Sequence, residues 1–272
     1  MARVLAALYG IAAYALFLVT FLYAIGFVGN FAVPRSIDSG TTGALVPSIL
    51  VNTALLLLFA LQHSVMARPG FKRWWTRFVP EPIERSTFVL LSSGALLLLY
   101  ALWRPMPASV WHVEAPAARA LLWGIFAVGW ATVFLSTVMI GHLDLFGLRQ
   151  VWLHLKGRPR PGDHFRSPWL YRLIRHPIMT GFLLAFWATP DMTAGHLLFS
   201  LATTGYILVA VRLEERDLIA AFGEVYREYR RRVPAFVPLP GRRWSGGADA
   251  PATEKTGSGA GYGVSPARPE PR

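Results

Sequence analysis

The stretch 175–240 decides the fold: it opens with RHPIMTGF (175–182), reaches RLEERDL (212–218) and closes with FGEVYREYRRRVPAFVPLP (222–240). Between the first two motifs the residues are largely apolar, and they are interrupted at Pro190-Asp191. A Pro-Asp pair favours a turn, so the stretch predicts a hairpin of two apolar helices. Charge beside a membrane segment is costly, and its clustering at the open end of this hairpin indicates a functional site.

The composition of the whole chain is that of a membrane protein. Of its 272 residues, 54% are hydrophobic and only 15% are charged, against roughly 25% charged residues in soluble domains. The net charge of +12 lies beside apolar segments, which favours anionic lipid and not nucleic acid as the partner. The chain has no cysteine, and this excludes disulfides, zinc–thiolate sites and a cysteine nucleophile.

Four apolar segments, each near the ~20 residues that cross a bilayer, precede the hairpin. They are residues 4–33, 45–67, 86–103 and 117–140. Together with the hairpin arms, 178–189 and 194–213, they predict an all-α polytopic membrane protein with five to six transmembrane helices. With six helices and both termini in the cytoplasm, all of the 27 Lys and Arg except Arg35, Arg104 and Arg119 lie on the cytoplasmic side, as the positive-inside rule requires.

Three regions follow from this organisation. Residues 1–140 form a four-span membrane bundle, and residues 141–240 hold a cytoplasmic connector, the hairpin and a cofactor-binding region. Residues 241–272 are rich in Gly, Ser, Pro and Ala. Because such a composition buries little apolar surface, we expect this tail to be disordered.

Two motifs predict the polar parts of a binding site. Arg175 and His176 precede Pro177, which suits the first position of a helix and leaves an anion-binding helix start; an ordinary interfacial helix start is the alternative. Glu214 and Glu215 lie at the other arm of the hairpin and either pair with neighbouring arginines or bind ligand hydroxyl and ammonium groups. Convergence of both motifs would suit a ligand with a carboxylate and an ammonium group.

The closing motif predicts an amphipathic cytoplasmic helix with Tyr226, Tyr229 and Arg230. One tyrosine could lie over an adenine or face a sulfonium through a cation–π contact, whereas packing on a neighbouring element is the alternative. Pro234 and Pro238 then end the helix and turn the chain back across the site.

The ordered set RHP, Gly181, the paired glutamates and FGEVYREYRRRVPAFVP resembles the carboxy-terminal signature of the isoprenylcysteine carboxyl methyltransferase and phospholipid methyltransferase superfamily. Met179 departs from this pattern, because a tyrosine is common at its position. The resemblance implies that Arg175, His176, Pro177 and Gly181, together with the acidic pair and the aromatic helix, bind S-adenosylmethionine.

Four further segments narrow the resemblance to the bacterial methanethiol S-methyltransferases, which are similar to the membrane proteins called NnrU. These segments are ALQHSVMARPGFK (60–72), ERSTFVLLSS (84–93), GHLDLFGLRQVW (141–152) and ATPDMTAGHLLF (188–199). The resemblance implies methyl transfer from S-adenosylmethionine to methanethiol, giving dimethyl sulfide, in a bacterial inner membrane. Hydrogen sulfide is an expected second acceptor, because a pocket for methanethiol hardly excludes a smaller analogue.

The thiolate is the reactive form of a small thiol, so a base or a cation should lie near the acceptor. The candidates are His63, His142, Asp144 and Arg149. A histidine satisfied inside the bundle, a helix cap and a positive-inside arginine are the respective alternatives. No metal is expected, since no His-x-x-x-His or Glu-x-x-His motif occurs.

Three other functions stay open on the sequence: an isoprenylcysteine or lipid methyltransferase, an NADPH-dependent membrane reductase, and a non-enzymatic accessory factor similar to NnrU. The oligomeric state is also open.

Overall fold

Five long apolar helices form the framework of the computed structural model, which describes residues 1–161, 164–245 and 249–251. They are α1 (Ala2–Gly29), α2 (Leu45–Ala67), α4 (Glu81–Leu102), α5 (Pro116–Ile140) and α9 (Ala194–Phe222). At about 1.5 Å per residue each is long enough to cross the ~30 Å hydrocarbon core. The predicted all-α polytopic membrane fold is confirmed.

The first arm of the hairpin is shorter than a full span. It forms α8 (Pro177–Trp187), which has 11 residues and therefore a length of about 16 Å. The second arm, α9, continues beyond the predicted residue 213 to Phe222, so the acidic motif lies within the helix and not after it. The sequence limits α8 because Pro177 fixes its start, and Thr189 and Pro190 follow its end.

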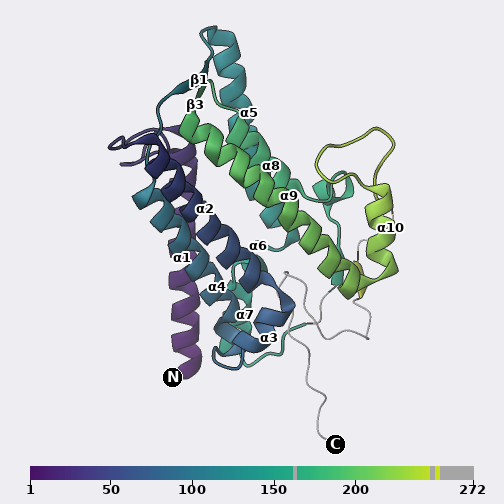
Figure 1. Ribbon diagram of the computed structural model, residues 1–272. Coiled ribbons are helices and arrows are strands. Elements are labelled where there is room, and N and C mark those ends of the chain that lie inside the picture. The colour runs from purple at the N-terminus through teal and green to yellow at the C-terminus, as the bar shows by residue number, and fades with distance from the viewer. Residues whose placement is uncertain (162–163, 246–248, 252–272) are drawn as a thin grey trace, which may run out of the picture.

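Shorter elements connect these helices. They are α3 (Pro69–Trp75), α6 (His142–Leu145), α7 (Leu148–Leu155), the 3-10 helix η1 (Trp169–Arg172), α10 (Glu224–Arg232) and the strands β1 (Ser109–His112), β2 (His164–Arg166), β3 (Asp191–Thr193) and β4 (Asp249–Pro251). β1 pairs antiparallel with β3, and β2 with β4. In Figure 1 the β1–β3 pair lies at one end of the bundle, and the N-terminus, α3 and α7 lie toward the other.

The helices α5 and α8 cross where glycine faces glycine. A Cβ added to Gly181 would lie 2.6 Å from the carbonyl oxygen of Gly129, and one added to Gly129 would lie 2.7 Å from the backbone nitrogen of Ala185. Both distances are too short for a side chain, so the backbones meet directly, as small residues allow in membrane bundles. This contact fixes the position of α8 against α5.

Two buried clusters stabilise the two ends of the hairpin. The larger includes Phe27, Trp103, Phe126 and Phe199 and ties α1, α4, α5 and α9 together. The smaller contains Phe165, Phe222, Tyr226, Tyr229 and Trp244 and packs α10 against the end of α9. Aromatic side chains bury large areas and prefer tilted or edge-to-face contacts, and Tyr229 and Trp244 meet at 90° with ring centroids 5.5 Å apart.

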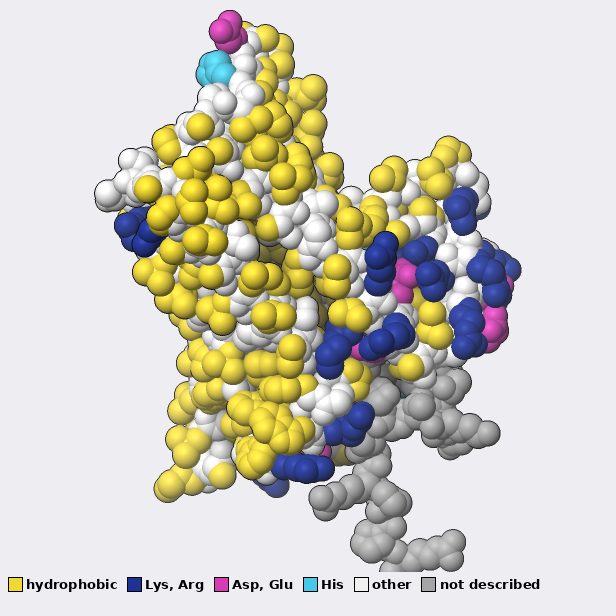
Figure 2. All heavy atoms as spheres, in the orientation of Figure 1, with side chains coloured by type: hydrophobic (Ala, Val, Ile, Leu, Met, Phe, Trp, Pro, Cys, Tyr) yellow, Lys and Arg dark blue, Asp and Glu magenta, His cyan; other side chains and the backbone are white. Residues whose placement is uncertain are grey.

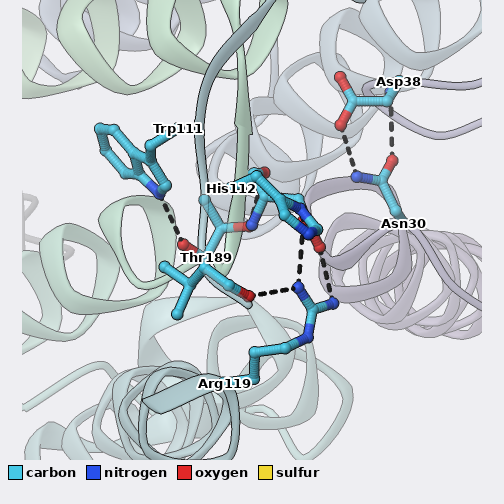
Figure 3. Close-up of polar contacts among 8 residues, drawn as sticks. Asn30, Asp38, Trp111, His112, Arg119 and Thr189 are labelled. Atoms are coloured by element: carbon cyan, nitrogen blue, oxygen red, sulfur yellow. Dashed lines mark hydrogen bonds and ion pairs between the residues drawn. The ribbon is translucent and has the colours of Figure 1, made fainter. Parts of the chain in front are cut away.

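A polar network closes the β1–β3 end. Asp191 accepts hydrogen bonds from Nη2 of Arg119 at 2.8 Å and pairs with Nδ1 of His112 at 2.5 Å. Figure 3 shows Arg119 and His112 converging, with the indole of Trp111 donating to the carbonyl of Thr189 beside them. We call Arg119, His112 and Asp191 the Asp191 cluster. It joins β1, β3 and α5, which the sequence did not predict to meet.

The expected disorder of 241–272 concerns mostly residues outside those described. Trp244, however, is buried, and its backbone N–H donates to the carbonyl of Arg172 at 2.9 Å. The ordered part of the chain thus extends beyond the predicted boundary at residue 241. For residues 246–248 and 252–272, which lie outside the described residues, disorder stays a prediction.

Candidate functional site

A cluster of ionisable groups lies where the start of α8 meets the last turns of α9. Nε of Arg175 donates to Oε1 of Glu215 at 2.7 Å, and Nε2 of His176 lies 3.1 Å from the same oxygen. Nε of Arg230, in α10, lies 2.9 Å from Oε2 of Glu215. Nδ1 of His176 lies 3.7 Å from Oε2 of Glu214. We call these five residues the Glu215 cluster; the structure brings both predicted motifs together in it.

The backbone that follows α10 holds the start of α8. The N–H groups of Arg175 and His176 donate to the carbonyls of Pro234 and Ala235 at 2.9 and 3.0 Å. The hydroxyl of Thr180 donates to the carbonyl of Phe236 at 2.9 Å. We call residues 233–236 the strap. It follows the end of α10 at Arg232, so the predicted return of the chain across the site is present in the structure.

Burial determines how this cluster behaves. The side chains of Glu215, His176 and Arg175 are 7%, 4% and 11% exposed, whereas that of Arg230 is 52% exposed. An ion taken out of water loses several kcal/mol of hydration, so a buried charge needs a partner of opposite sign. Glu215 can therefore give up its pairing with these basic side chains only when a ligand supplies another cation in their place. The basic side chains gathered over α10 stand out against the apolar bundle surface in Figure 2.

Tyr226 and Tyr229 face the smaller buried cluster. The hydroxyl of Tyr229 donates to the carbonyl of Tyr171 at 2.5 Å, and the ring of Tyr226 meets Phe165 edge to face. Burial raises the pKa of both phenols above the usual range, so they stay neutral. Both tyrosines therefore pack on neighbouring elements, which was the alternative to ligand binding. Contact with an adenine or a sulfonium stays a prediction.

Two residues named from the RHP motif have backbone roles. Pro177 is the first residue of α8, as predicted, and is buried. Gly181 lies at the contact with α5 described above, one turn further along α8. The structure therefore gives Gly181 a role in placing the helix that follows His176, and a direct contact between Gly181 and a cofactor stays a prediction.

The predicted acceptor-side residues do not form one group. His142 lies between α1 and α5, where Nε2 is 2.8 Å from the hydroxyl of Tyr14 and Nδ1 is 2.8 Å from Oγ1 of Thr137. Burial lowers the pKa of His142. Asp144 accepts from Nη1 of Arg149 at 2.5 Å. These residues fasten the connector α6–α7, and both ring nitrogens of His142 are occupied.

His63 has different surroundings, near the end of α2. Its Nδ1 lies 3.3 Å from Oγ of Ser92 in α4. The ring lies between those of Phe59 and Phe88, at centroid distances of 5.3 and 4.9 Å. His63 therefore contacts side chains of α2 and α4, whereas His142 contacts side chains of α1 and α5.

Sequence reasoning missed the contacts that join α2 to α9. Nη1 of Arg68 donates to Oδ2 of Asp217 at 2.7 Å, and the side chains of Ser64 and Tyr206 are hydrogen-bonded. Asp217 follows the acidic pair within RLEERDL, and Arg68 ends a predicted span. Opposite charges at the same ends of two spans were the available signal.

Within the described ranges, no group of three or more His, Asp or Glu side chains could hold a metal ion. No protein-family model and no solved structure matches the chain.

Relatives of known name match most of the chain. A methanethiol S-methyltransferase of Mycobacterium tuberculosis is 59% identical over 242 residues, which cover 89% of this chain and 99% of that protein. Methanethiol S-methyltransferase 2 of Bradyrhizobium diazoefficiens is 59% identical over 87% of this chain and 91% of that protein. The Nurim protein of Sus scrofa is 33% identical over 63% of this chain and 70% of that protein.

Proposed function

Because the chain belongs to the methanethiol S-methyltransferase family, we propose that it transfers a methyl group from S-adenosylmethionine to methanethiol, giving dimethyl sulfide. The observation that carries this proposal is the 59% identity to a methanethiol S-methyltransferase over 99% of that protein. The chain is an integral membrane methyltransferase. No observation favours the lipid methyltransferase, reductase or accessory-factor alternatives over this function.

The Glu215 cluster has the donor set that S-adenosylmethionine requires. This methyl donor carries a carboxylate and an ammonium group, and the cluster offers Arg175 and Arg230 for the first and Glu214 and Glu215 for the second. Arg175 and Arg230 now pair with Glu215 at 2.7 and 2.9 Å, so a zwitterion can replace these internal pairs without leaving a buried charge alone. The cluster and the methyl donor are thus complementary in charge and in hydrogen-bonding groups.

The donor supplies an activated methyl group on a sulfonium, and its transfer to sulfur needs little acid or base help. The protein's main task is to align the reactants and exclude water. His176, buried between the two carboxylates, fixes their orientation. The strap holds the start of α8, so Arg175 and His176 keep their positions relative to Glu215.

The reaction is tested with purified protein in detergent, given labelled S-adenosylmethionine and methanethiol, by measuring dimethyl sulfide in the headspace. We expect product from the natural chain and none above background from His176→Ala. Calorimetry gives donor affinity in the same samples, and NADPH is added as a competitor. Absence of product despite donor binding would contradict methanethiol as acceptor, and absence of donor binding would contradict the methyltransferase itself. Hydrogen sulfide, tested in parallel, is expected to yield methanethiol.

We also propose that both termini and the Glu215 cluster face the cytoplasm of a bacterial inner membrane. The distribution of Lys and Arg supports this orientation. Because the chain lacks cysteine, single cysteines report on it without background. Thr42→Cys near the β1–β3 end should react with an impermeant thiol reagent on intact cells, whereas Arg227→Cys in α10 should react only after lysis. The reverse pattern would contradict the proposed orientation.

A further inference from the structure

His63 lies on α2, with Ser92 of α4 and the ring of Phe59 as neighbours, and Phe59 in turn contacts Tyr206 of α9. Figure 2 shows the surface hollowed between α2 and α9. Phe59, His63 and Tyr206 are half-buried and lie on the two helices that flank this hollow, which we call the recess. The two helices meet through Phe59 and Tyr206, with ring centroids 6.2 Å apart, and again through Arg68 and Asp217.

The hydrogen bonds distinguish the two histidines that the sequence offered as bases. Both ring nitrogens of His142 have hydroxyl partners at 2.8 Å. In His63 only Nδ1 has one, Oγ of Ser92 at 3.3 Å, and Nε2 has no hydrogen-bond partner among the described residues. A base must offer a nitrogen to the proton that it removes. His63 meets this requirement, and His142 does not.

The walls of the recess suit a small thiol. His63 lies between the rings of Phe59 and Phe88, and Phe59 in turn meets Tyr206. Divalent sulfur makes favourable contacts with aromatic rings at about 5 Å. A pocket of this kind takes an apolar acceptor of few atoms and needs only one polar group to orient it.

The recess also adjoins the Glu215 cluster. Tyr206 lies within electrostatic reach of Glu214, and Glu214 contacts Nδ1 of His176. On α9, Tyr206 and Glu214 are eight residues apart, about two helical turns on the same face. Neighbouring side chains, from His63 through Phe59 and Tyr206 to Glu214, therefore connect the recess to the Glu215 cluster.

We infer that this recess is the acceptor site, with His63 as the catalytic base and Phe59 and Tyr206 as the side chains that limit acceptor size. The inference rests on the proposed function. Nε2 of His63 takes the S–H proton of methanethiol, a C–S bond forms between the acceptor sulfur and the methyl carbon, and the bond from that carbon to the donor sulfur breaks. The electron pair of the broken bond stays on the donor sulfur, and the proton on His63 leaves to solvent.

Acceptor size is tested with Phe59→Ala against Leu58→Ala, its neighbour on α2, whose side chain is 46% exposed. The measurement is the kcat/KM ratio of propanethiol to methanethiol. We expect Phe59→Ala to raise this ratio at least about tenfold, since one methylene in an apolar pocket is worth about 10- to 200-fold. Leu58→Ala should leave the ratio unchanged. If both variants had the same ratio while the natural chain formed dimethyl sulfide, the recess would not be the acceptor site, but the proposed function would stand.

The base is tested with His63→Gln, measuring kcat/KM for methanethiol across pH and donor affinity by calorimetry. We expect a loss of about 100-fold or more near neutral pH. The loss should shrink as pH rises, because solvent then supplies thiolate. Donor affinity should stay within about twofold of the natural chain. A loss independent of pH, or a loss of donor binding, would overturn the role of base. No dimethyl sulfide from the natural chain would overturn the acceptor site and the proposed function together.

Discussion

The two ends of the hairpin carry the same three chemical groups in opposite settings. The Asp191 cluster and the Glu215 cluster each join a carboxylate to an arginine and a histidine. In the first, the side chains of Asp191, Arg119 and His112 are 45%, 33% and 59% exposed. In the second, those of Glu215, Arg175 and His176 are 7%, 11% and 4% exposed. Water remains an alternative partner for every member of the first cluster and hardly reaches the core of the second.

This difference in exposure indicates a structural role for the first cluster and a ligand-binding role for the second. Exposed ion pairs add little stability, because water solvates their members almost as well when they separate. Buried pairs leave a large penalty when one member is lost, so they persist unless a ligand replaces a partner. The Asp191 cluster therefore links β1, β3 and α5 with little effect on stability, whereas the Glu215 cluster is suited to exchanging its internal partners for those of a zwitterion.

The largest expected effect is that of Glu215→Ala. It leaves Arg175 and His176 buried without their shared acceptor, a loss of about 3–5 kcal/mol for a broken buried pair. The thermal midpoint in detergent should fall markedly and methyl transfer should vanish. Glu224→Ala is the matched control, since Glu224 also pairs with arginines but on the surface. Equal midpoints for the two variants would remove the contrast between buried and exposed clusters.

The second largest effect is expected for Gly181→Ala, a substitution that changes no charge. The added Cβ would lie 2.6 Å from a backbone oxygen of α5, and overpacking of this kind costs about 1–3 kcal/mol. We expect a lower thermal midpoint and weaker donor binding, because α8 directly follows His176. Gly205→Ala on α9 is the control, with open space around its Cβ. If Gly181→Ala behaved like this control, helix placement would not limit the buried cluster.

Arg230→Ala should separate binding from stability. Arg230 is 52% exposed, so its loss should hardly move the thermal midpoint. We expect donor affinity to fall about tenfold, or about 1.4 kcal/mol, since a charge-assisted partner for the donor is lost. Arg231→Ala, whose partner Glu224 lies on the surface, should leave affinity unchanged. Unchanged affinity in Arg230→Ala would place the donor elsewhere.

The smallest effect is expected at Asp191, and it depends on pH. The hydrogen bond from Arg119, followed by that from His112, lowers the pKa of Asp191. A lowered pKa stabilises the folded state above the ordinary value near 3.9 and loses this contribution as pH falls through the folded value. Proteolysis of the β1–β3 end should therefore increase only in strong acid, and Asp191→Asn should abolish that dependence. A transition near pH 6 would contradict this assignment.

Hydropathy predicted the long helices, because a span is a local property of about 20 residues. The meeting of Arg175 and His176 with Glu215 was also predictable, since a hairpin brings the ends of its two arms together. The length of α8 was less predictable: residues 178–189 are apolar apart from Thr180 and Thr189, but the helix ends at Trp187.

Other features depend on contacts that no local pattern contains. His112 and Asp191 are 79 residues apart, and the strands that carry them are too short to show alternation. The spacing of Tyr226 and Tyr229 predicted that they share one helix face. It did not indicate that this face contacts Phe165 and not a ligand. A helix period indicates which residues share a face, but not what covers that face.

The strap has a consequence for biogenesis. Its carbonyls receive the N–H groups of Arg175 and His176, yet they belong to residues translated after the last membrane helix. Chains are made from the N-terminus, so a ribosome-bound chain can have every long helix inserted while its binding site is still unassembled. We therefore expect that a chain truncated before residue 233 is inserted in the membrane but does not bind the methyl donor.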